Sequence, residues 1–292
     1  MFDSADDVAT LLKRVGYLPD PAIATAVYLG ERLGKPVLVE GPAGTGKTEL
    51  AKSVAAATGR RLIRLQCYEG LDEAKALYEW DYRKQLLRLQ SRAAGAEGDW
   101  KQVEGDLFGE DFLLTRPLLA AIRATDPVVL LVDEVDRLDI ETEALLLEVL
   151  SDYQVSIPEL GTLRATQVPL VYLTSNNSRE LSEALKRRCL FLHLDYPSID
   201  REREIVLGRV PGISEHLATQ ITAVVRSLRS LDLRKRPSVS ETLDWARTLV
   251  LVGAEDIDED LLRETMNVLL KYATDISMAS ARLGDLGTRP GP

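Results

Sequence analysis

Cysteine is scarce in this sequence, which contains two in 292 residues, Cys67 and Cys189. Both lie inside apolar runs, as small buried hydrophobic side chains do, and this spacing excludes a disulfide framework or a cysteine-based metal site. No apolar run is long enough to span a membrane, and the first residues, MFDSADDVATLLKRVG, carry acids where a signal peptide needs bases. We therefore expect a cytoplasmic protein without a membrane span.

Basic residues are also in deficit, because 36 Lys and Arg face 46 Asp and Glu and leave a net charge of -10. Such a charge opposes non-specific binding to a polyanion, so nucleic acid is not an expected partner. The 45% of hydrophobic and 28% of charged residues are typical of a globular protein. A chain of this length exceeds what one hydrophobic core usually serves, which predicts one large domain and a smaller one.

Strand-like and helical patterns alternate through the first two thirds of the chain. The spacing of apolar residues predicts helices over 5–14 and 20–33, over 48–58, and over 141–152, the last capped by Asp139. Strand-like runs occupy 35–40, 61–67, 128–134, 168–176 and 190–196. Two of these runs, VVLLV and PLVYL, are apolar almost throughout, as strands of a parallel sheet covered on both faces are. The pattern predicts an α/β fold, and after Asp200 only helical patterns remain.

Two segments interrupt this alternation. Residues 71–92 have the spacing of an amphipathic helix, and 93–112 resemble a mobile loop that is too long for a plain connection. Residues 153–167 suggest a β-hairpin between a helix and a strand. Three aromatic residues, Trp80, Tyr82 and Trp100, are either contacts for a partner or part of the core.

The segment GPAGTGKT at 41–48 matches the phosphate-binding pattern G-x-x-x-x-G-K-[ST] and follows a predicted strand and precedes a predicted helix. Its glycines let backbone N–H groups approach phosphate oxygens, and the helix N-terminus adds partial positive charge. Lys47 would reach the β- and γ-phosphates, and Thr48 would offer a hydroxyl to Mg²⁺. The predicted ATP-binding residues are Gly41, Pro42, Ala43, Gly44, Thr45, Gly46, Lys47, Thr48 and Glu49.

Polar residues follow two other predicted strands. Asp133 and Glu134 end the run VVLLVDE, at the carboxyl end of a strand where α/β sheets bind ligands. We expect Asp133 to hold Mg²⁺ through water and Glu134 to orient or deprotonate the attacking water. Asn176 ends the next strand and is a candidate for the γ-phosphate or that water, although asparagine also commonly terminates strands.

The segment EALKRRC supplies Arg187 and Arg188 at the end of a short predicted helix. An arginine there can stabilise the transition-state charge on a neighbouring subunit's nucleotide, as an arginine finger does. A cation that complements a helix C-terminus is the simpler interpretation of the same residues.

The order of these motifs resembles that of the AAA+ ATPases, and the resemblance covers nearly the whole chain. Within that superfamily, DEVDRLDIETEALLLEVLSDYQVSIPELG resembles the MoxR branch, and the nearest likeness is to accessory ATPases encoded with carbon monoxide dehydrogenase. The resemblance implies a five-stranded parallel sheet sandwiched by helices, with a smaller all-helical lid. It divides the chain into a nucleotide-binding domain at 1–199, with an insert at about 70–112 and a hairpin at about 153–167, a lid at 200–283 and a disordered tail at 284–292.

The resemblance also assigns roles to individual residues. It makes Asn176 the first sensor residue and Arg188 the arginine finger, with Arg187 as a substitute, in a hexameric ring. Arg137 matches a basic position after the family's acidic pair, where a plain surface arginine is the alternative. Tyr17 lies where the family holds adenine, although an ordinary turn explains it equally well.

The chain departs from the family in the lid, where Ser238 stands at the place of a second sensor arginine. Arg234 or Arg236 would then take over that role. Because the lid of these enzymes reports on the γ-phosphate, this departure leaves the lid's part in the mechanism open.

Relatives in this branch are thought to use ATP to remodel client proteins or to insert metals, usually with a partner that contains a von Willebrand factor A domain. The expected function is therefore Mg²⁺-dependent ATP hydrolysis that drives maturation of a client metalloenzyme, such as a molybdenum hydroxylase. Two alternatives share the nucleotide motifs: a DNA-directed motor and a nucleotide-dependent scaffold with little turnover. The hairpin sequence QVSIPELGTLRATQ holds only Arg164 as a base, which argues against the motor.

Overall fold

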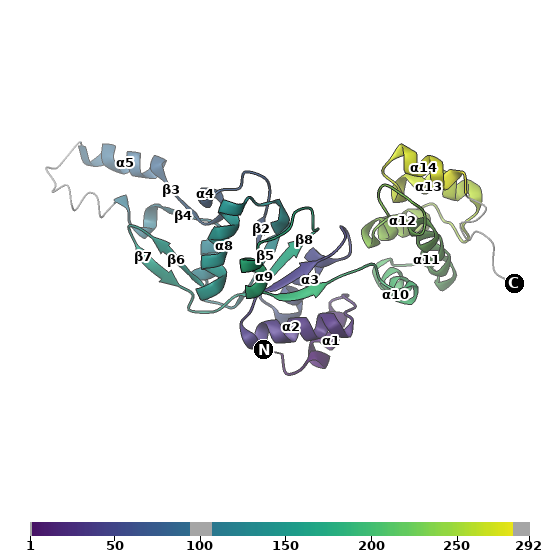
Figure 1. The fold of residues 1–292 in the computed structure, drawn as a ribbon, viewed down its shortest axis with the longest axis horizontal. Coiled ribbons are helices and arrows are strands. Elements are labelled where there is room, and N and C mark those ends of the chain that lie inside the picture. The colour runs from purple at the N-terminus through teal and green to yellow at the C-terminus, as the bar shows by residue number, and fades with distance from the viewer. Residues whose placement is uncertain (1, 94–106, 283–292) are drawn as a thin grey trace. The chain divides into compact units, whose positions relative to one another are not determined.

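The computed structural model describes residues 2–93 and 107–282 (Figure 1). Within them the chain forms two compact units, a sheet unit of residues 2–40 and 48–193 and a helical unit of residues 41–47 and 194–282. The domain boundary expected at residue 199 remains a prediction. Trp100 and the expected tail lie outside the described residues. In the described part of the chain, no helix combines the length and apolar character needed to cross a membrane.

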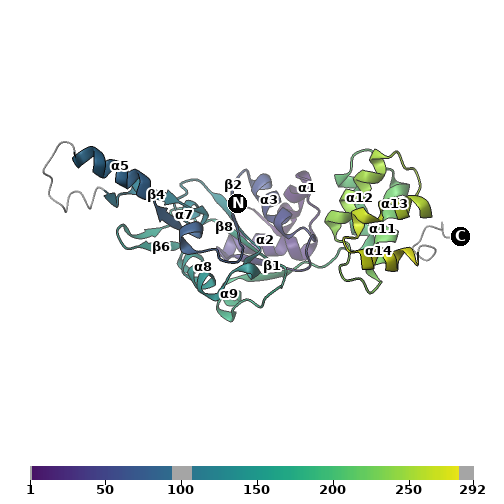
Figure 2. The ribbon, with the colours of Figure 1, turned by 90° about the horizontal axis from the view of Figure 1, so that it is seen from above.

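A five-stranded parallel sheet forms the centre of the sheet unit, in the order β2-β5-β8-β1-β9. The strands are β1 (Val37–Glu40), β2 (Arg61–Gln66), β5 (Val128–Asp133), β8 (Leu170–Ser175) and β9 (Leu190–His193). Every residue of β5 and β8 is buried, because helices cover both faces of the sheet (Figures 1 and 2). The five strand-like runs and the predicted α/β fold are confirmed.

Helices flank this sheet, and several of them begin at a residue whose side chain caps the first turn. They are α1 (Ala5–Arg14), α2 (Pro21–Leu33), α3 (Lys47–Thr58), α7 (Pro117–Ile122), α8 (Ile140–Asp152) and α9 (Glu183–Arg188). Asp139 accepts the backbone N–H of Thr142, as predicted, and so caps α8. Gly34 closes α2 in the left-handed conformation with φ 59°, which glycine adopts without a steric cost.

The insert between β2 and α7 differs from the prediction of one helix over 71–92. The structure has α4 (Glu73–Ala76), β3 (Tyr78–Trp80) and α5 (Tyr82–Ala93), and β3 pairs antiparallel with β4 (Leu113–Thr115) after a short 3-10 helix at Glu110–Phe112. The aromatic strand forms because Trp80 is buried and packs edge-to-face on Phe108, 5.3 Å between ring centroids. Trp80 is therefore a core residue, whereas the Tyr82 side chain is exposed.

The predicted hairpin is confirmed as β6 (Gln154–Ile157) and β7 (Gly161–Arg164), which pair antiparallel. Gly161 takes φ 76° at the start of β7, a left-handed conformation that favours glycine. In the sequence, the β6–β7 hairpin lies between α8 and the buried strand β8.

Between residues 200 and 282 the structure has helices and no strand, as the purely helical patterns of this part of the sequence predicted. The helical unit contains α10 (Ile199–Arg209), α11 (Glu215–Arg229), α12 (Val239–Leu251), α13 (Glu259–Leu269) and α14 (Ala273–Ser280), all labelled in Figure 1. Trp245 lies fully buried at the centre of this unit, and its indole Nε1–H donates to the Thr265 hydroxyl over 2.8 Å. The core thus has one large aromatic residue whose polar atom is satisfied.

Candidate nucleotide site

Asp133 is the centre of a hydrogen-bonded cluster at the carboxyl end of β5. Its Oδ1 accepts the Thr48 hydroxyl over 2.8 Å and the Thr174 hydroxyl over 2.5 Å. Its Oδ2 accepts two bonds from the Arg64 guanidinium, 3.0 Å from Nε and 2.5 Å from Nη2. The carboxylate, 2% exposed, therefore has all of its roughly four acceptor positions occupied.

Glu134 is held in an unusual backbone conformation next to this cluster. Its φ of 58° lies in the left-handed region, which non-glycine residues seldom occupy and which is often found at functional sites. The Glu134 N–H donates to the Thr174 hydroxyl over 2.9 Å, and its carboxylate pairs with Arg137 Nε at 2.7 Å. The expected base is therefore neutralised by Arg137, the arginine whose role the sequence left open.

Asp136 shapes the loop that follows β8 and carries Asn176. Its Oδ2 accepts the backbone N–H of Asn176 at 3.2 Å, and both the N–H and the hydroxyl of Ser178, at 2.9 and 2.6 Å. Burial opposes ionisation of Asp136, but these bonds outweigh it and lower its pKa. The Asp136 carboxylate thus ties the end of β8, with the expected sensor residue, to the end of β5.

A second buried carboxylate fixes the segment before α9. Glu143, in α8 and 2% exposed, pairs with Arg179 at 2.7 Å and accepts the Ser182 N–H at 2.8 Å. Burial would raise the pKa of Glu143, but the bonds from Ser182 and Arg179 outweigh it and lower the pKa. The start of α9, which leads to Arg188, is therefore anchored on α8.

The glycine-rich loop is closed by its own lysine. Lys47 is 6% exposed, and its Nζ donates to the carbonyl oxygens of Gly41 and Pro42, both at 2.7 Å. The Thr45 hydroxyl also donates to Pro42 O, at 2.9 Å. Lys47 begins α3, so the loop leads directly into a helix N-terminus, the arrangement that binds phosphate.

Within the helical unit, the first residues of α12 lie against Gly44 of this loop. Gly44 has φ 74°, and a Cβ at this position would lie 2.1 Å from the Ser238 hydroxyl oxygen. Ser238 caps α12 in a capping box with Glu241. Arg234 and Arg236 are both exposed, and Arg234 stacks at 4.2 Å on the Tyr272 ring, so the role expected of either arginine stays a prediction.

The structure does not bring Arg188 together with Asp133 in one chain. Arg188 ends α9 just before β9, and β8 and β1 separate β9 from β5, roughly 14 Å across the sheet. Arg187 and Arg188 are both exposed, and Arg188 donates to Ala184 O at 3.0 Å and to the Ser151 hydroxyl.

The remaining predicted residues lie near the ends of helices. Tyr17 is half-buried between α1 and α2, and its N–H donates to Leu12 O at 3.0 Å. Glu49 is in the first turn of α3. Neither position tests the adenine or nucleotide contact expected of it.

Three residues of the site were missed from the sequence: Arg64, Thr174 and Asp136. Asp136 is a third acid within DEVD, and Thr174 stands in the segment LTSN, so both lay inside motifs that had already been recognised. Arg64 had no such signal, since it reaches Asp133 only because β2 and β5 are neighbours, with Gln66 opposite Asp133.

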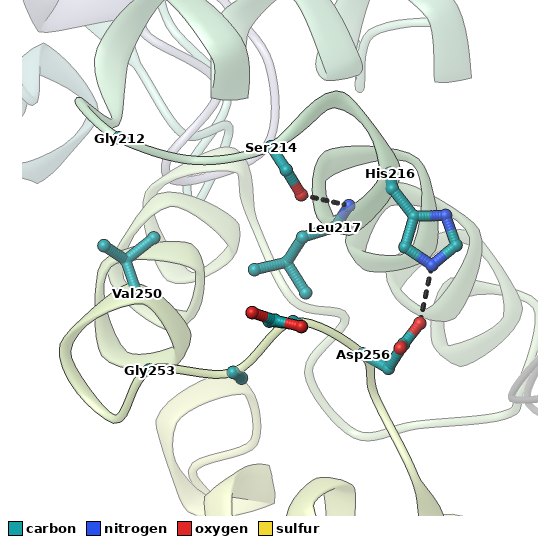
Figure 3. A pocket seen from close by; sticks show the side chains of 9 residues that line it. Gly212, Ser214, His216, Leu217, Val250, Gly253 and Asp256 are labelled. Carbon is teal, nitrogen blue, oxygen red and sulfur yellow. Dashed lines mark hydrogen bonds and ion pairs between the residues drawn. The ribbon is translucent and has the colours of Figure 1, made fainter.

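A pocket of about 480 Å³ lies elsewhere, in the loops of the helical unit (Figure 3). His216 and Asp256, both largely exposed, meet at its rim over 2.6 Å. Its lining residues are Gly212, Ser214, His216, Leu217, Val250, Gly253, Ala254, Glu255 and Asp256. None of these belongs to the motifs, and the two acids among them, Glu255 and Asp256, do not favour a phosphate.

Residues 36–189, more than half of the chain, match the model of the AAA domain of the dynein-related subfamily. The chain belongs to this AAA family. This match begins just before β1 and ends just after α9, so it includes the glycine-rich loop, β5 and β8, and it establishes the chain as a nucleotide-binding ATPase.

The chain is similar to two named bacterial proteins. The denitrification regulatory protein NirQ of Pseudomonas aeruginosa is 26% identical over 218 residues, 72% of this chain and 74% of NirQ. The gas vesicle ATPase GvpN of Ancylobacter aquaticus is 29% identical over 238 residues, 76% of this chain and 62% of GvpN. Among solved structures, RuvB of Thermotoga maritima shares the fold, with a TM-score of 0.51, 20% identity, and coverage of 91% of this chain and 72% of RuvB.

Proposed function

We propose that this ATPase hydrolyses MgATP at the loop Gly41 to Thr48 with Asp133 and Glu134. The observation that carries the proposal is the Thr48–Asp133 contact, which joins two residues 85 positions apart, directly after Lys47 and at the end of β5. A hydroxyl and a buried carboxylate 2.8 Å apart fit Mg²⁺, which takes few protein ligands beside phosphate and water oxygens. When bound, Mg²⁺ would neutralise charge on the phosphates.

The other residues of the cluster then have distinct tasks. Lys47 would turn from its carbonyl partners to the β- and γ-phosphates. Glu134 would orient the attacking water once Arg137 no longer neutralises it. Asn176, held at the strand end through Asp136, would report on the γ-phosphate.

We also propose that the chain works as a homo-oligomeric ring, with six subunits the expected number. Arg188 is exposed and lies three strands from β5 in its own subunit, so the Asp133 site it would complete belongs to a neighbour. AAA ATPases commonly form such rings, which supports this reading. Arg187, exposed beside it, is the substitute candidate.

The work done with ATP is proposed to be remodelling of a client protein complex. Similarity to a regulatory protein, NirQ, and to a gas vesicle ATPase, GvpN, supports an ATPase that acts on other proteins. A MoxR-type role in maturing a molybdenum hydroxylase such as carbon monoxide dehydrogenase, with a von Willebrand factor A domain partner in the cytoplasm, is the specific form of this proposal.

One observation favours a second candidate, a motor that acts on nucleic acid. The helix α5 has exposed Arg83, Lys84 and Arg88 and no acidic residue, in a chain that is acidic overall. Fluorescence anisotropy with labelled duplex DNA at rising salt decides between the two. Binding that weakens with salt and is lost when the three bases become glutamine supports the motor, and no binding supports remodelling of a protein.

Steady-state turnover of Glu134→Gln tests the catalytic assignment. Loss of a positioned general base should lower kcat about 10²- to 10⁴-fold, with nucleotide binding retained. Glu141→Gln, an exposed residue in the first turn of α8, is the matched control and should keep wild-type turnover. Equal rates for wild type and Glu134→Gln would overturn the assignment of Glu134 as the catalytic base.

A further inference from the structure

The Asp133 carboxylate, the expected magnesium ligand, forms an ion pair with Arg64. The Arg64 guanidinium gives two donors to Oδ2, while Thr48 and Thr174 both use Oδ1. One oxygen of the carboxylate is thus held by hydroxyls and the other by a positive charge. The two oxygens of the Asp133 carboxylate, which are equivalent in a free aspartate, therefore have different partners.

The position of Arg64 follows from the sheet. Arg64 and Gln66 lie on the same face of β2, since side chains alternate along a strand, and Gln66 is opposite Asp133 in the β2–β5 ladder. Arg64 Nη2 also donates to Gln66 Oε1, so the guanidinium is oriented by its own strand. The contact is a feature of strand order and not of a flexible loop.

The two partners differ strongly in burial. The Asp133 side chain is 3% exposed, whereas that of Arg64 is 46% exposed. A buried carboxylate without a partner is unfavourable, so Arg64 stabilises Asp133 in the nucleotide-free enzyme. Because the guanidinium stands half in solvent, it can leave without crossing the core.

Mg²⁺ requires the same carboxylate. A divalent ion with its hydration shell, held by Thr48 and Asp133, would bring a second cation to the carboxylate that Arg64 already neutralises, and two cations repel at such a distance. Neutralisation of one carboxylate by both cations at once is therefore disfavoured.

We propose that Arg64 is an exchangeable counter-cation: it neutralises Asp133 in the empty site and is displaced when Mg²⁺ binds with the nucleotide. Arg64 is therefore a positioning residue that sets the Mg²⁺ concentration at which the enzyme loads. This inference rests on the proposed role of Asp133 as a magnesium ligand. The exchange keeps the buried carboxylate compensated in both states.

The test is a Mg²⁺ titration of binding of fluorescent N-methylanthraniloyl-ADP, a readout that does not depend on turnover. Removing the competing charge in Arg64→Gln should lower the half-saturating Mg²⁺ concentration about fivefold, the lower end of ordinary coupling, because Arg64 is half-exposed. Arg64→Lys keeps the charge and should stay within about twofold of wild type. Arg61→Gln, an exposed arginine on the same strand, makes the same charge change away from Asp133 and should shift nothing.

A requirement for Mg²⁺ in Arg64→Gln that equals or exceeds that of wild type overturns the proposal, because Arg64 would then assist the metal or ignore it. If Arg64→Gln does not unfold cooperatively, Arg64→Met, which keeps the apolar stem, takes its place in the same comparison. Asp133→Asn separates the two levels of the argument. If this variant keeps the wild-type Mg²⁺ dependence, the proposed metal site is wrong; if it loses that dependence while Arg64→Gln shows no shift, only the exchange is wrong.

Discussion

The polar residues at the carboxyl ends of β5 and β8 and those at the end of α9 are built in opposite ways. Asp133 and Asp136 are almost fully buried, and each accepts at least three hydrogen bonds. Arg187 and Arg188 are exposed. Groups that must be fixed within one subunit are held by a network, whereas groups that would act on another subunit stand at the surface.

The largest effect is expected from replacing Arg188, one of the two exposed arginines. Arg188→Ala should lower kcat at least about a hundredfold, since arginine fingers contribute much of the transition-state stabilisation, and should leave folding stability almost unchanged. Steady-state turnover and urea unfolding measure the two quantities.

Mixing Arg188→Ala with Glu134→Gln should restore part of the activity, because some shared sites then contain both Glu134 and Arg188. A mixture as inactive as its components contradicts action in trans, and Arg187→Ala shows which arginine is used.

The second largest effect is expected at Asp136, one of the two buried carboxylates. Asp136→Asn removes charge-assisted bonds to Ser178 and Asn176 and should cost about 1 to 3 kcal/mol of unfolding free energy, measured in urea. Because bonding lowers the pKa of Asp136 in the folded state, its contribution is complete above its unfolded pKa of about 3.9 and is lost as the pH falls through the lower folded value.

In Asp136→Asn the unfolding free energy should therefore fall less steeply than in wild type as the pH is lowered below about 3.9. Asp126→Asn, at an exposed loop position, is the control and should keep the wild-type stability and pH profile. A wild-type pH dependence in Asp136→Asn would show that the hydrogen bonds of Asp136 do not control the end of β8.

The smallest effect is expected at Thr174, which links the two strand ends by one hydroxyl. Thr174→Val keeps the shape and removes the bonds to Asp133 and from Glu134 N–H, which should cost about 1 kcal/mol of stability and lower kcat more than it raises KM. Thr174→Ser retains the hydroxyl and should restore both quantities. A rise in KM alone would place Thr174 in nucleotide binding instead.

The sequence was sufficient for elements whose signals are local. The five strands, the hairpin, the cap at Asp139 and the glycine-rich loop between β1 and α3 all depend on neighbouring residues, and each was predicted close to its observed bounds. The position of Asp133 at a strand end followed from the same reasoning. The residues assigned to catalysis remain predictions.

What the sequence could not supply was the order of the strands. Arg64 touches Asp133 because β2 lies beside β5, and Thr174 touches it because β8 lies on the other side. The prediction of one helix in the insert was wrong for a similar reason. Tyr78 to Trp80 become a strand only by pairing with Leu113–Thr115, more than 30 residues later. Helical periodicity over 71–92 was real but weaker than this pairing and the burial of Trp80.

The approach of Ser238 to Gly44 has a consequence for any library that randomises the phosphate loop. A side chain at position 44 would both require a left-handed backbone and overlap a serine hydroxyl of the same unit. A selection for abundance alone, with no demand for nucleotide, should therefore still retain glycine at this position. Tolerance profiles of the loop would overstate how much of its sequence is dictated by the ligand.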